Sequence, residues 1–256
     1  MRIVVKVGTS TLAHATGHLN IKRVEELCKV LSDIKNAGHE VVLVSSGAIG
    51  MGLGKLLIKS KPDDIPTKQA AAAVGQCELM YTYDKLFSEY NHTVAQILLT
   101  GADVKDPVRH GNFQNTVYRL LELGAIPVIN ENDSIATEEI VIGDNDTLGA
   151  IVATSINADL LIILSDINGL YTGDPHKDAN ATLIKVVEEI NDDILKLGGG
   201  SGSSLGTGGM KTKLTAAEIT TGGGVDMIIA NGNNPAAIYD MVGGNDFVGT
   251  KFCKRK

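Results

Sequence analysis

Carboxylates and amides gather in two short segments of this 256-residue sequence. Residues 130–134 read NENDS after an apolar run, and residues 143–147 read GDNDT shortly afterwards. Acidic groups this close together repel one another unless a cation is present, and an ammonium group, Mg²⁺ or a lysine could supply it. Asp and Asn also cap helices, so Asp144 or Asn145 could simply cap the helix that follows. For the group as a whole we favour a functional role.

Three glycine-rich loops form a second set of candidates: residues 6–10 (KVGTS), 45–52 (SSGAIGMG) and 206–210 (GTGGM). Glycine lets the backbone approach an oxyanion closely, and loops that end at helix N-termini aim N–H groups at it. Each loop alone could be only a tight turn. Three loops at strand ends, two with a lysine beside them, favour a bound polyanion. Neither the P-loop pattern nor the G-x-G-x-x-G dinucleotide pattern occurs.

Two further segments are candidates for nucleotide binding. Residues 165–175 (SDINGLYTGDP) follow a strongly apolar run and could form a platform for the base. Residues 198–209 are rich in glycine and serine, which suits a flexible linker but also a mobile ligand loop inside one domain. Because an ordinary helical pattern resumes after them, the sequence supports the loop at least as well as the linker. If they form the loop, we expect nucleotide to protect it from proteolysis.

The elements that would position these segments alternate between strand and helix. This order is typical of βαβ units on a mostly parallel sheet. Helical spacing predicts a helix over residues 21–34, with Asn20 as N-cap and Gly38 as its stop, and Pro66 opens a long helix to about residue 90. We expect a single domain over residues 1–256, an α/β three-layer α/β/α sandwich with a mostly parallel central sheet. The predicted strands are residues 3–7, 40–45, 93–99, 126–130, 160–164 and 226–230.

Composition narrows the possible partners and location. The net charge of −7 argues against a general nucleic-acid binder. No apolar stretch is long enough to cross a membrane, and the three scattered cysteines fit neither a disulfide framework nor a zinc site, so we expect a cytoplasmic protein. The basic residues in 251–256 are expected to form a frayed, solvated end.

Two other features receive structural interpretations. His14 and His18 lie four residues apart, but without a third histidine or a nearby carboxylate they do not predict a metal site. The alanines of residues 70–73 could lie near a substrate or form a close helix-packing face, and we favour packing.

Taken together, these segments resemble the amino-acid kinase family, most closely its members that phosphorylate free glutamate. The match extends over nearly the whole chain in the family's order, at residues 5–10, 44–49, 69–76, 130–133, 143–146, 165–171 and 206–213. The sequence ends soon after residue 252, so we expect a short form without the C-terminal PUA domain that many members carry.

The resemblance implies an enzyme that uses ATP and Mg²⁺ to phosphorylate the γ-carboxylate of L-glutamate. In such a site Lys6 and Lys213 would neutralise the transferring phosphoryl group, and Asp146 would hold both lysines. Glutamate would be bound by Ser46, Asp133 and Asn145. The nucleotide would be bound by Lys6, Ser165, Asp166, Thr207, Gly208, Gly209, Met210, Lys211, Thr212 and Lys213. No protein metal ligands are assigned.

The resemblance also implies partners. The acyl-phosphate product would pass to a glutamyl phosphate reductase in proline synthesis, proline could act as a feedback inhibitor, and a homo-oligomer is expected. Three alternatives remain open: a kinase for N-acetylglutamate, an amino-acid sensor on the same fold, and a dehydrogenase. Asp133 among other acids favours an ammonium-bearing substrate, a sensor would not need both lysines, and the missing dinucleotide pattern disfavours a dehydrogenase.

Overall fold

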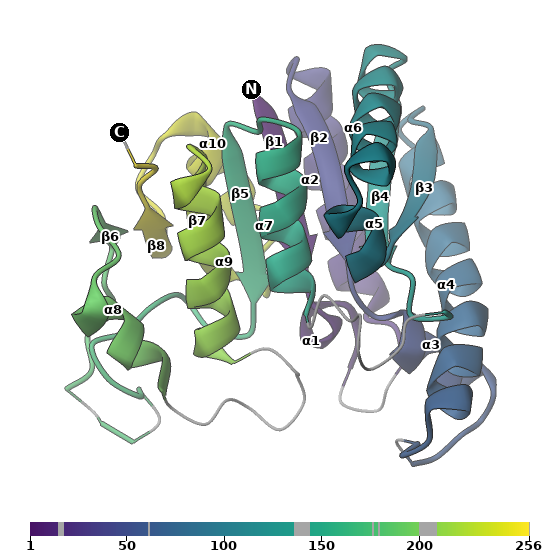
Figure 1. Cartoon of the computed structure of the whole chain (residues 1–256), viewed down its shortest axis with the longest axis horizontal. Helices are drawn as coiled ribbons and strands as arrows, with labels where there is room; N and C mark the ends of the chain where they lie inside the picture. Colours follow the sequence, from purple (N-terminus) through teal and green to yellow (C-terminus); the bar gives the residue numbers. More distant parts are fainter. Residues whose placement is uncertain are drawn as a thin grey trace.

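The computed structural model describes residues 1–14, 18–60, 62–135, 144–175, 177–178, 180–199 and 209–255. Within this part of the chain, strands and helices alternate as the sequence predicts (Figure 1). The strands are β1 (Arg2–Val7), β2 (Glu40–Ser45), β3 (Val94–Leu99), β4 (Ile126–Glu131), β5 (Leu160–Ser165), β6 (Val186–Val187), β7 (Asp226–Asn231) and β8 (Gly249–Phe252). The helices are α1 (Thr9–Leu12), α2 (Ile21–Asn36), α3 (Ala48–Lys55), α4 (Ile65–Ser88), α5 (Gly101–Lys105), α6 (Pro107–Glu122), α7 (Asn145–Ser155), α8 (Asp192–Lys196), α9 (Met210–Gly222) and α10 (Ala237–Gly243), with a 3₁₀ turn η1 (Leu197–Gly199).

The strands form one eight-stranded sheet in the order β3-β4-β2-β1-β5-β7-β8-β6. The six strands from β3 to β7 are parallel, whereas β8 runs antiparallel to β7 and β6 runs parallel to β8. The parallel strands therefore end at one common edge, which is where open α/β sheets bind their ligands.

Helices cover both faces of this sheet, which confirms the predicted three-layer sandwich. One core packs α6, α7 and α9 against one face, and a second core packs α2, α4 and α10 against the other. In Figure 1, α7 and α9 lie in front of the sheet and α2 and α4 behind it. Because β1, β2 and β5 are covered on both sides, they are buried along almost their whole length and mostly apolar, with polar residues only at or next to their ends.

Most predicted boundaries are confirmed to within two residues. Asn20 caps α2 by accepting from the backbone N–H of Arg23, and Gly38 beyond its end has φ +94°. The long helix predicted from Pro66 begins at Ile65 with Asp64 as its cap and ends at Ser88. The glycine-rich segment predicted as a ligand loop lies almost entirely outside the described residues.

The prediction of a frayed basic C-terminus is wrong. Residues 249–252 form β8, and Lys251 Nζ lies 2.9 Å from Asp226 Oδ2. Beyond the strand, Lys254 N–H donates to Asp226 Oδ1 at 2.9 Å and Arg255 N–H to Thr221 O at 3.0 Å. The buried strand β7 and its partner β8 hold this end, although its own sequence contains no long apolar run.

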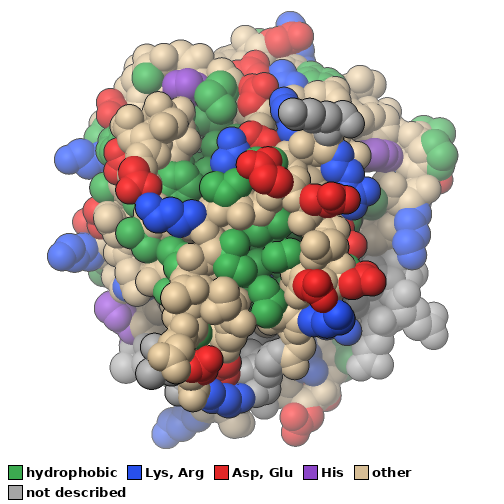
Figure 2. All heavy atoms as spheres, turned by 90° about the vertical axis from the view of Figure 1, so that its left-hand side faces the viewer, with side chains coloured by type: hydrophobic (Ala, Val, Ile, Leu, Met, Phe, Trp, Pro, Cys, Tyr) green, Lys and Arg blue, Asp and Glu red, His purple; other side chains and the backbone are tan. Residues whose placement is uncertain are grey.

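The edge of the sheet that ends in β6 faces the viewer in Figure 2. Hydrophobic side chains gather near the centre of this face, and charged side chains surround them. Val186 of β6 contributes to the exposed apolar surface at this edge. None of the helices in the described part of the chain combines the length and the apolar character needed to cross a lipid bilayer.

Candidate functional site

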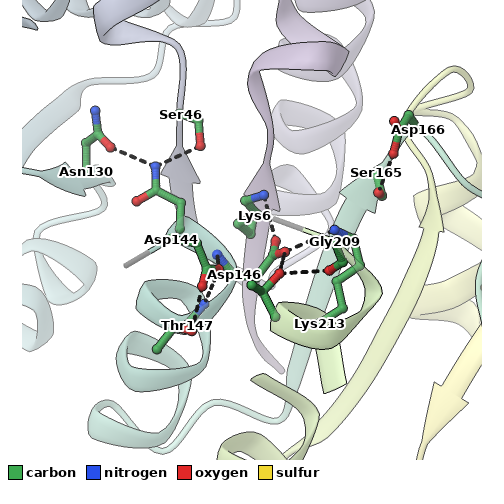
Figure 3. Close-up of polar contacts among 12 residues, drawn as sticks. Lys6, Ser46, Asn130, Asp144, Asp146, Thr147, Ser165, Asp166, Gly209 and Lys213 are labelled. Atoms are coloured by element: carbon green, nitrogen blue, oxygen red, sulfur yellow. Dashed lines mark hydrogen bonds and ion pairs between the residues drawn. The ribbon is translucent and has the colours of Figure 1, made fainter. Parts of the chain in front are cut away.

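A buried ion triad joins β1, α7 and α9 at the carboxyl edge of the sheet. Lys6 Nζ lies 2.6 Å from Asp146 Oδ1, and Lys213 Nζ lies 3.0 Å from Asp146 Oδ2 (Figure 3). All three residues are buried, a location that Lys and Asp rarely occupy unless they are paired. With two lysines and one carboxylate, the triad carries one more positive than negative charge, which favours an anion beside it.

The protonation of Asp146 follows from these neighbours. Burial by itself would raise the pKa of the Asp146 carboxyl, but the charges of Lys6 and Lys213 and their hydrogen bonds outweigh it and lower that pKa below its ordinary value. Asp146 is therefore ionised at neutral pH and holds both ammonium groups in place.

Helix α9 starts beside the triad, and no side chain of the described residues caps its first N–H groups. Gly209 occupies the N-cap position without a side-chain bond to the helix, and Thr212 Oγ1 donates to Gly209 O at 2.9 Å and to Asp146 Oδ2 at 3.3 Å. Uncapped N–H groups and the positive end of the helix dipole favour an anion here.

The other residues predicted for this nucleotide segment divide into two groups. Met210 lies partly buried in the first turn of α9 next to exposed Lys211. Thr207 and Gly208 lie outside the described residues.

On one side of the triad, a chain of amides links two strand ends. Asn145 Nδ2 donates to Ser46 Oγ at 2.7 Å and to Asn130 Oδ1 at 2.9 Å. Asp144 accepts from the backbone N–H groups of Asp146 and Thr147, which confirms that Asp144 caps α7. The cap fixes the first turn of α7, so the same turn can direct Asn145 toward β2 and β4 and Asp146 toward the lysines.

A cavity of about 460 Å³ lies next to this amide chain. It holds Asp133, and burial raises the pKa of the Asp133 carboxyl above its ordinary value. Among the described residues, no lysine or arginine pairs with Asp133. A bound cationic group would lower that pKa again, so the cavity suits an ammonium group. Its lining is Ala48, Ala72, Ala73, Gln76, Cys77, Met80, Gln96, Leu98, Glu131, Asn132, Asp133 and Ser134.

The candidate nucleotide segment lies on the opposite side of the triad. Ser165 ends β5, and its Oγ donates to Asp166 Oδ1 at 3.0 Å. In Figure 3, Asn130 and Ser46 flank Lys6 on one side, and Ser165 and Asp166 lie beyond it on the other. The structure thus brings Lys6, Asp146 and Lys213 into direct contact. It sets Ser46 and Asn145 on one side of them and Ser165 and Asp166 on the other.

The alanine segment packs as expected, with one addition. A Cβ built on Gly52 of α3 would lie 1.8 Å from Ala71 O, so α3 and α4 pack backbone to backbone at the predicted alanines. Ala72 and Ala73 also line the cavity, so the run serves both interpretations. No group of three metal-ligating side chains occurs among the described residues, and His14 N–H bonds to His18 O within a short loop.

Three buried polar residues that support the site received no individual role from the sequence. Tyr83 OH lies 2.7 Å from Ser45 Oγ, Gln76 Oε1 accepts from Asn130 Nδ2 at 2.9 Å, and Thr250 Oγ1 accepts from Leu170 N–H at 2.8 Å. The only available signal was a polar residue at a core position of a helix or strand.

Comparison with known proteins identifies the group to which this architecture belongs. Residues 1–231 match the model of the Amino acid kinase family. A Glutamate 5-kinase of Clostridium perfringens is 53% identical over 100% of this chain and 96% of its own length. A Glutamate 5-kinase of Caldanaerobacter subterraneus subsp. tengcongensis is 51% identical over the whole chain, which covers 68% of that longer protein.

Solved structures support the fold at much lower sequence identity. Carbamate kinase from Giardia lamblia superposes with a TM-score of 0.71 at 18% identity, covering 99% of this chain and 98% of that one. UMP kinase from Ureaplasma parvum gives a TM-score of 0.67 at 14% identity over 99% of this chain and 98% of that one.

Proposed function

This chain belongs to the amino acid kinase family, and we propose that it transfers the γ-phosphoryl group of ATP to the side-chain carboxylate of free L-glutamate, giving glutamyl 5-phosphate and ADP. The relatives named Glutamate 5-kinase support this at about half identity over the full chain. The observation that carries it is the Lys6–Asp146–Lys213 triad, set between an acid-lined cavity and the segment after β5.

The proposed reaction depends more on aligning the reacting groups and neutralising the phosphoryl charge than on proton transfer. A carboxylate is already ionised at neutral pH, so its attack on phosphorus requires no general base. In phosphoryl transfer the protein mainly holds the reacting groups in line and stabilises the charge on the transferring group. Lys6 and Lys213 supply two positive charges at one point, and Asp146 keeps their ammonium groups apart and oriented.

Mg²⁺ fits this site as an ion that accompanies ATP. Asp146 is engaged by two lysines, and no three-residue metal cluster occurs in the described part of the chain. Proteins commonly bind Mg²⁺ through substrate phosphates with few ligands of their own. When bound, the ion would neutralise phosphate charge next to Lys6 and Lys213.

The substrate end follows from the groups that line it. Glutamate carries two carboxylates and one ammonium group, and we assign the pairing with the ammonium to Asp133, which lines the cavity and has a raised pKa. Ser46 and Asn145 would bind the substrate between this acid and the lysines. Ser165, Asp166 and residues 207–213 would bind the nucleotide on the other side.

We place this reaction at the start of proline biosynthesis, as a single kinase domain in the cytoplasm. An acyl phosphate is reactive, so a reductase that consumes glutamyl phosphate is the expected downstream partner, with proline as a feedback inhibitor. A homo-oligomer is also expected. The free thiols of Cys28, Cys77 and Cys253 are typical of a reducing compartment.

The test is ADP formation with matched acceptors. We expect ADP to form with L-glutamate and ATP only when Mg²⁺ is present, and much more slowly with N-acetyl-L-glutamate, which has no ammonium group for Asp133. A coupled assay with both acceptors, with and without EDTA, measures this. A higher kcat/KM for the acetylated acceptor would refute the assignment to free glutamate.

A further inference from the structure

Helix α4 carries a buried glutamine, Gln76, that has no assigned role in the proposed reaction. Gln76 is 8% exposed, and its carboxamide bonds on both sides. Its Oε1 accepts from Asn130 Nδ2 at 2.9 Å, and its Nε2 donates to Gln96 Oε1 at 3.3 Å. Asn130 in turn accepts from Asn145, so Gln76 begins a chain of amides that ends at the first turn of α7.

A backbone group fixes the direction of every bond in this chain. The N–H of Glu131, which can only donate, bonds to Asn130 Oδ1 at 2.9 Å. Asn145 must therefore approach that oxygen with Nδ2, and the same Nδ2 also reaches Ser46 Oγ. Asn145 Oδ1 is left buried, and no donor among the described residues bonds to it. A buried acceptor of this kind destabilises the protein unless a hydrogen-bond donor pairs with it.

The rest of α4 is fixed firmly enough to act as a support. A Cβ on Gly75 would lie 1.7 Å from Ala48 O, so the helix backbone touches the start of α3 directly at this point. Two turns further along, Tyr83 OH bonds to Ser45 Oγ at 2.7 Å. The same helix thus contacts the end of β2 through Tyr83 and the end of β4 through Gln76.

We infer that Gln76 is a positioning residue for the amino-acid substrate. It holds Asn130, which orients the Asn145 amide so that its oxygen, not its nitrogen, is left for a hydrogen-bond donor of the substrate. This inference rests on the proposed function, which places Asn145 at glutamate. The only donor on ionised glutamate is its ammonium group, so the orientation favours an amino acid with a free amine.

Kinetics of three variants test this inference. Gln76→Met keeps the volume and removes the acceptor, so the glutamate KM should rise about three- to tenfold while kcat and the ATP KM stay within about twofold. Gln76→Glu keeps an oxygen for Asn130 Nδ2 and should restore most of the affinity. Gln114→Met on α6 removes a glutamine that bonds to Ser155 O and does not line the cavity, so it should match the wild type. If Gln76→Met does not fold, Gln76→Ala takes its place.

A second measurement does not depend on catalysis. In ¹H–¹⁵N spectra, the side-chain amide protons of Asn130 and Asn145 should exchange slowly in the wild type and in Gln114→Met, and faster in Gln76→Met. If this pattern appears but the wild type does not phosphorylate glutamate, the positioning role stands and the proposed function fails. If Gln76→Met leaves both the exchange rates and the glutamate KM unchanged in an active enzyme, the inference is overturned.

Discussion

At the scale of single residues, one carboxylate holds two lysines at the point where phosphoryl charge would be transferred. Lys213→Met removes one ammonium group but leaves Asp146 paired with Lys6, so the fold should survive. Because this charge acts on the transition state more than on bound substrate, we expect kcat to fall roughly 100- to 1,000-fold with the glutamate KM within about threefold. Steady-state kinetics check this prediction. Lys29→Met, at an exposed position of α2, is the charge-matched control. Normal turnover in Lys213→Met would exclude the role.

Asp133 should act on binding and not on chemistry. Asp133→Asn keeps the shape of the side chain but removes the charge proposed to pair with the ammonium group of glutamate. A lost charge-assisted contact of about 1.5–3 kcal/mol corresponds to roughly ten- to a hundredfold in glutamate KM, with the ATP KM nearly unchanged. Initial rates with each substrate varied in turn measure both constants. A variant impaired for ATP and not for glutamate would contradict the assignment.

The raised pKa of Asp133 gives this prediction a pH dependence. Its carboxyl is harder to ionise in the free enzyme than an ordinary aspartate, so as the pH falls toward that raised pKa the free site becomes protonated and glutamate binds more weakly. The wild-type glutamate KM should therefore increase on acidification. Asp133→Asn should lose this dependence, because an amide has no proton to gain.

At the scale of elements, the contact between α3 and α4 determines where the substrate loops lie. Gly75→Ala would place a methyl group 1.7 Å from Ala48 O and 2.5 Å from Gly52 N, both backbone atoms that cannot move away easily. We expect a loss of about 1–3 kcal/mol in the free energy of unfolding, or more, and a higher glutamate KM. Gly111→Ala in α6 is the matched control, because nothing lies within 4 Å of its added methyl group. It should stabilise the protein slightly. Thermal unfolding of both variants measures the difference, and equal melting temperatures would contradict it.

The strands show how much of the fold could be predicted from the sequence. Strands β1, β2, β4, β5 and β7 are apolar runs buried on both faces, so hydropathy alone located them. β6 has only two residues and β8 contains Gly249 and Lys251, so neither carries an apolar pattern. Their pairing depends on a neighbour far away in sequence. This is why the C-terminal lysines were assigned to a frayed end.

For the site, position along the chain was predictable but side-chain contact was not. Parallel strands place residues after β1, β2, β4 and β5 at one edge, and this much follows from the strand order. That Asp146 bonds to both Lys6 and Lys213 came from family resemblance, since spacing does not determine the direction of a side chain. Gln76 and Tyr83 looked like ordinary polar residues in a helix.

At the scale of the whole molecule, Thr250 of β8 supports residues that lie 80 and 66 positions earlier in the sequence. β8 inserts between β7 and β6, so the last strand of the described residues is internal to the sheet. Thr250 is fully buried in it and bonds outward, accepting from Leu170 N–H at 2.8 Å and donating to Ile184 O at 2.6 Å. These two bonds hold the chain at Leu170 and at Ile184, both of which lie in the segment that follows Ser165 and Asp166.

Replacing Thr250 should therefore weaken nucleotide binding from a distance. Thr250→Val keeps the shape but leaves Leu170 N–H and Ile184 O without this partner, at a cost of about 1–3 kcal/mol for each unsatisfied group. At roughly 2–4 °C per kcal/mol for a chain of this size, the melting temperature should drop by several degrees. Because the displaced segment adjoins the proposed nucleotide residues, we also expect a severalfold higher ATP KM and an unchanged glutamate KM. Thr116→Val, an exposed threonine on α6 that bonds only within its helix, should change neither. If Thr250→Val melts earlier but binds ATP normally, residues 165–171 support the fold without binding the nucleotide, and the ATP site must lie closer to α9.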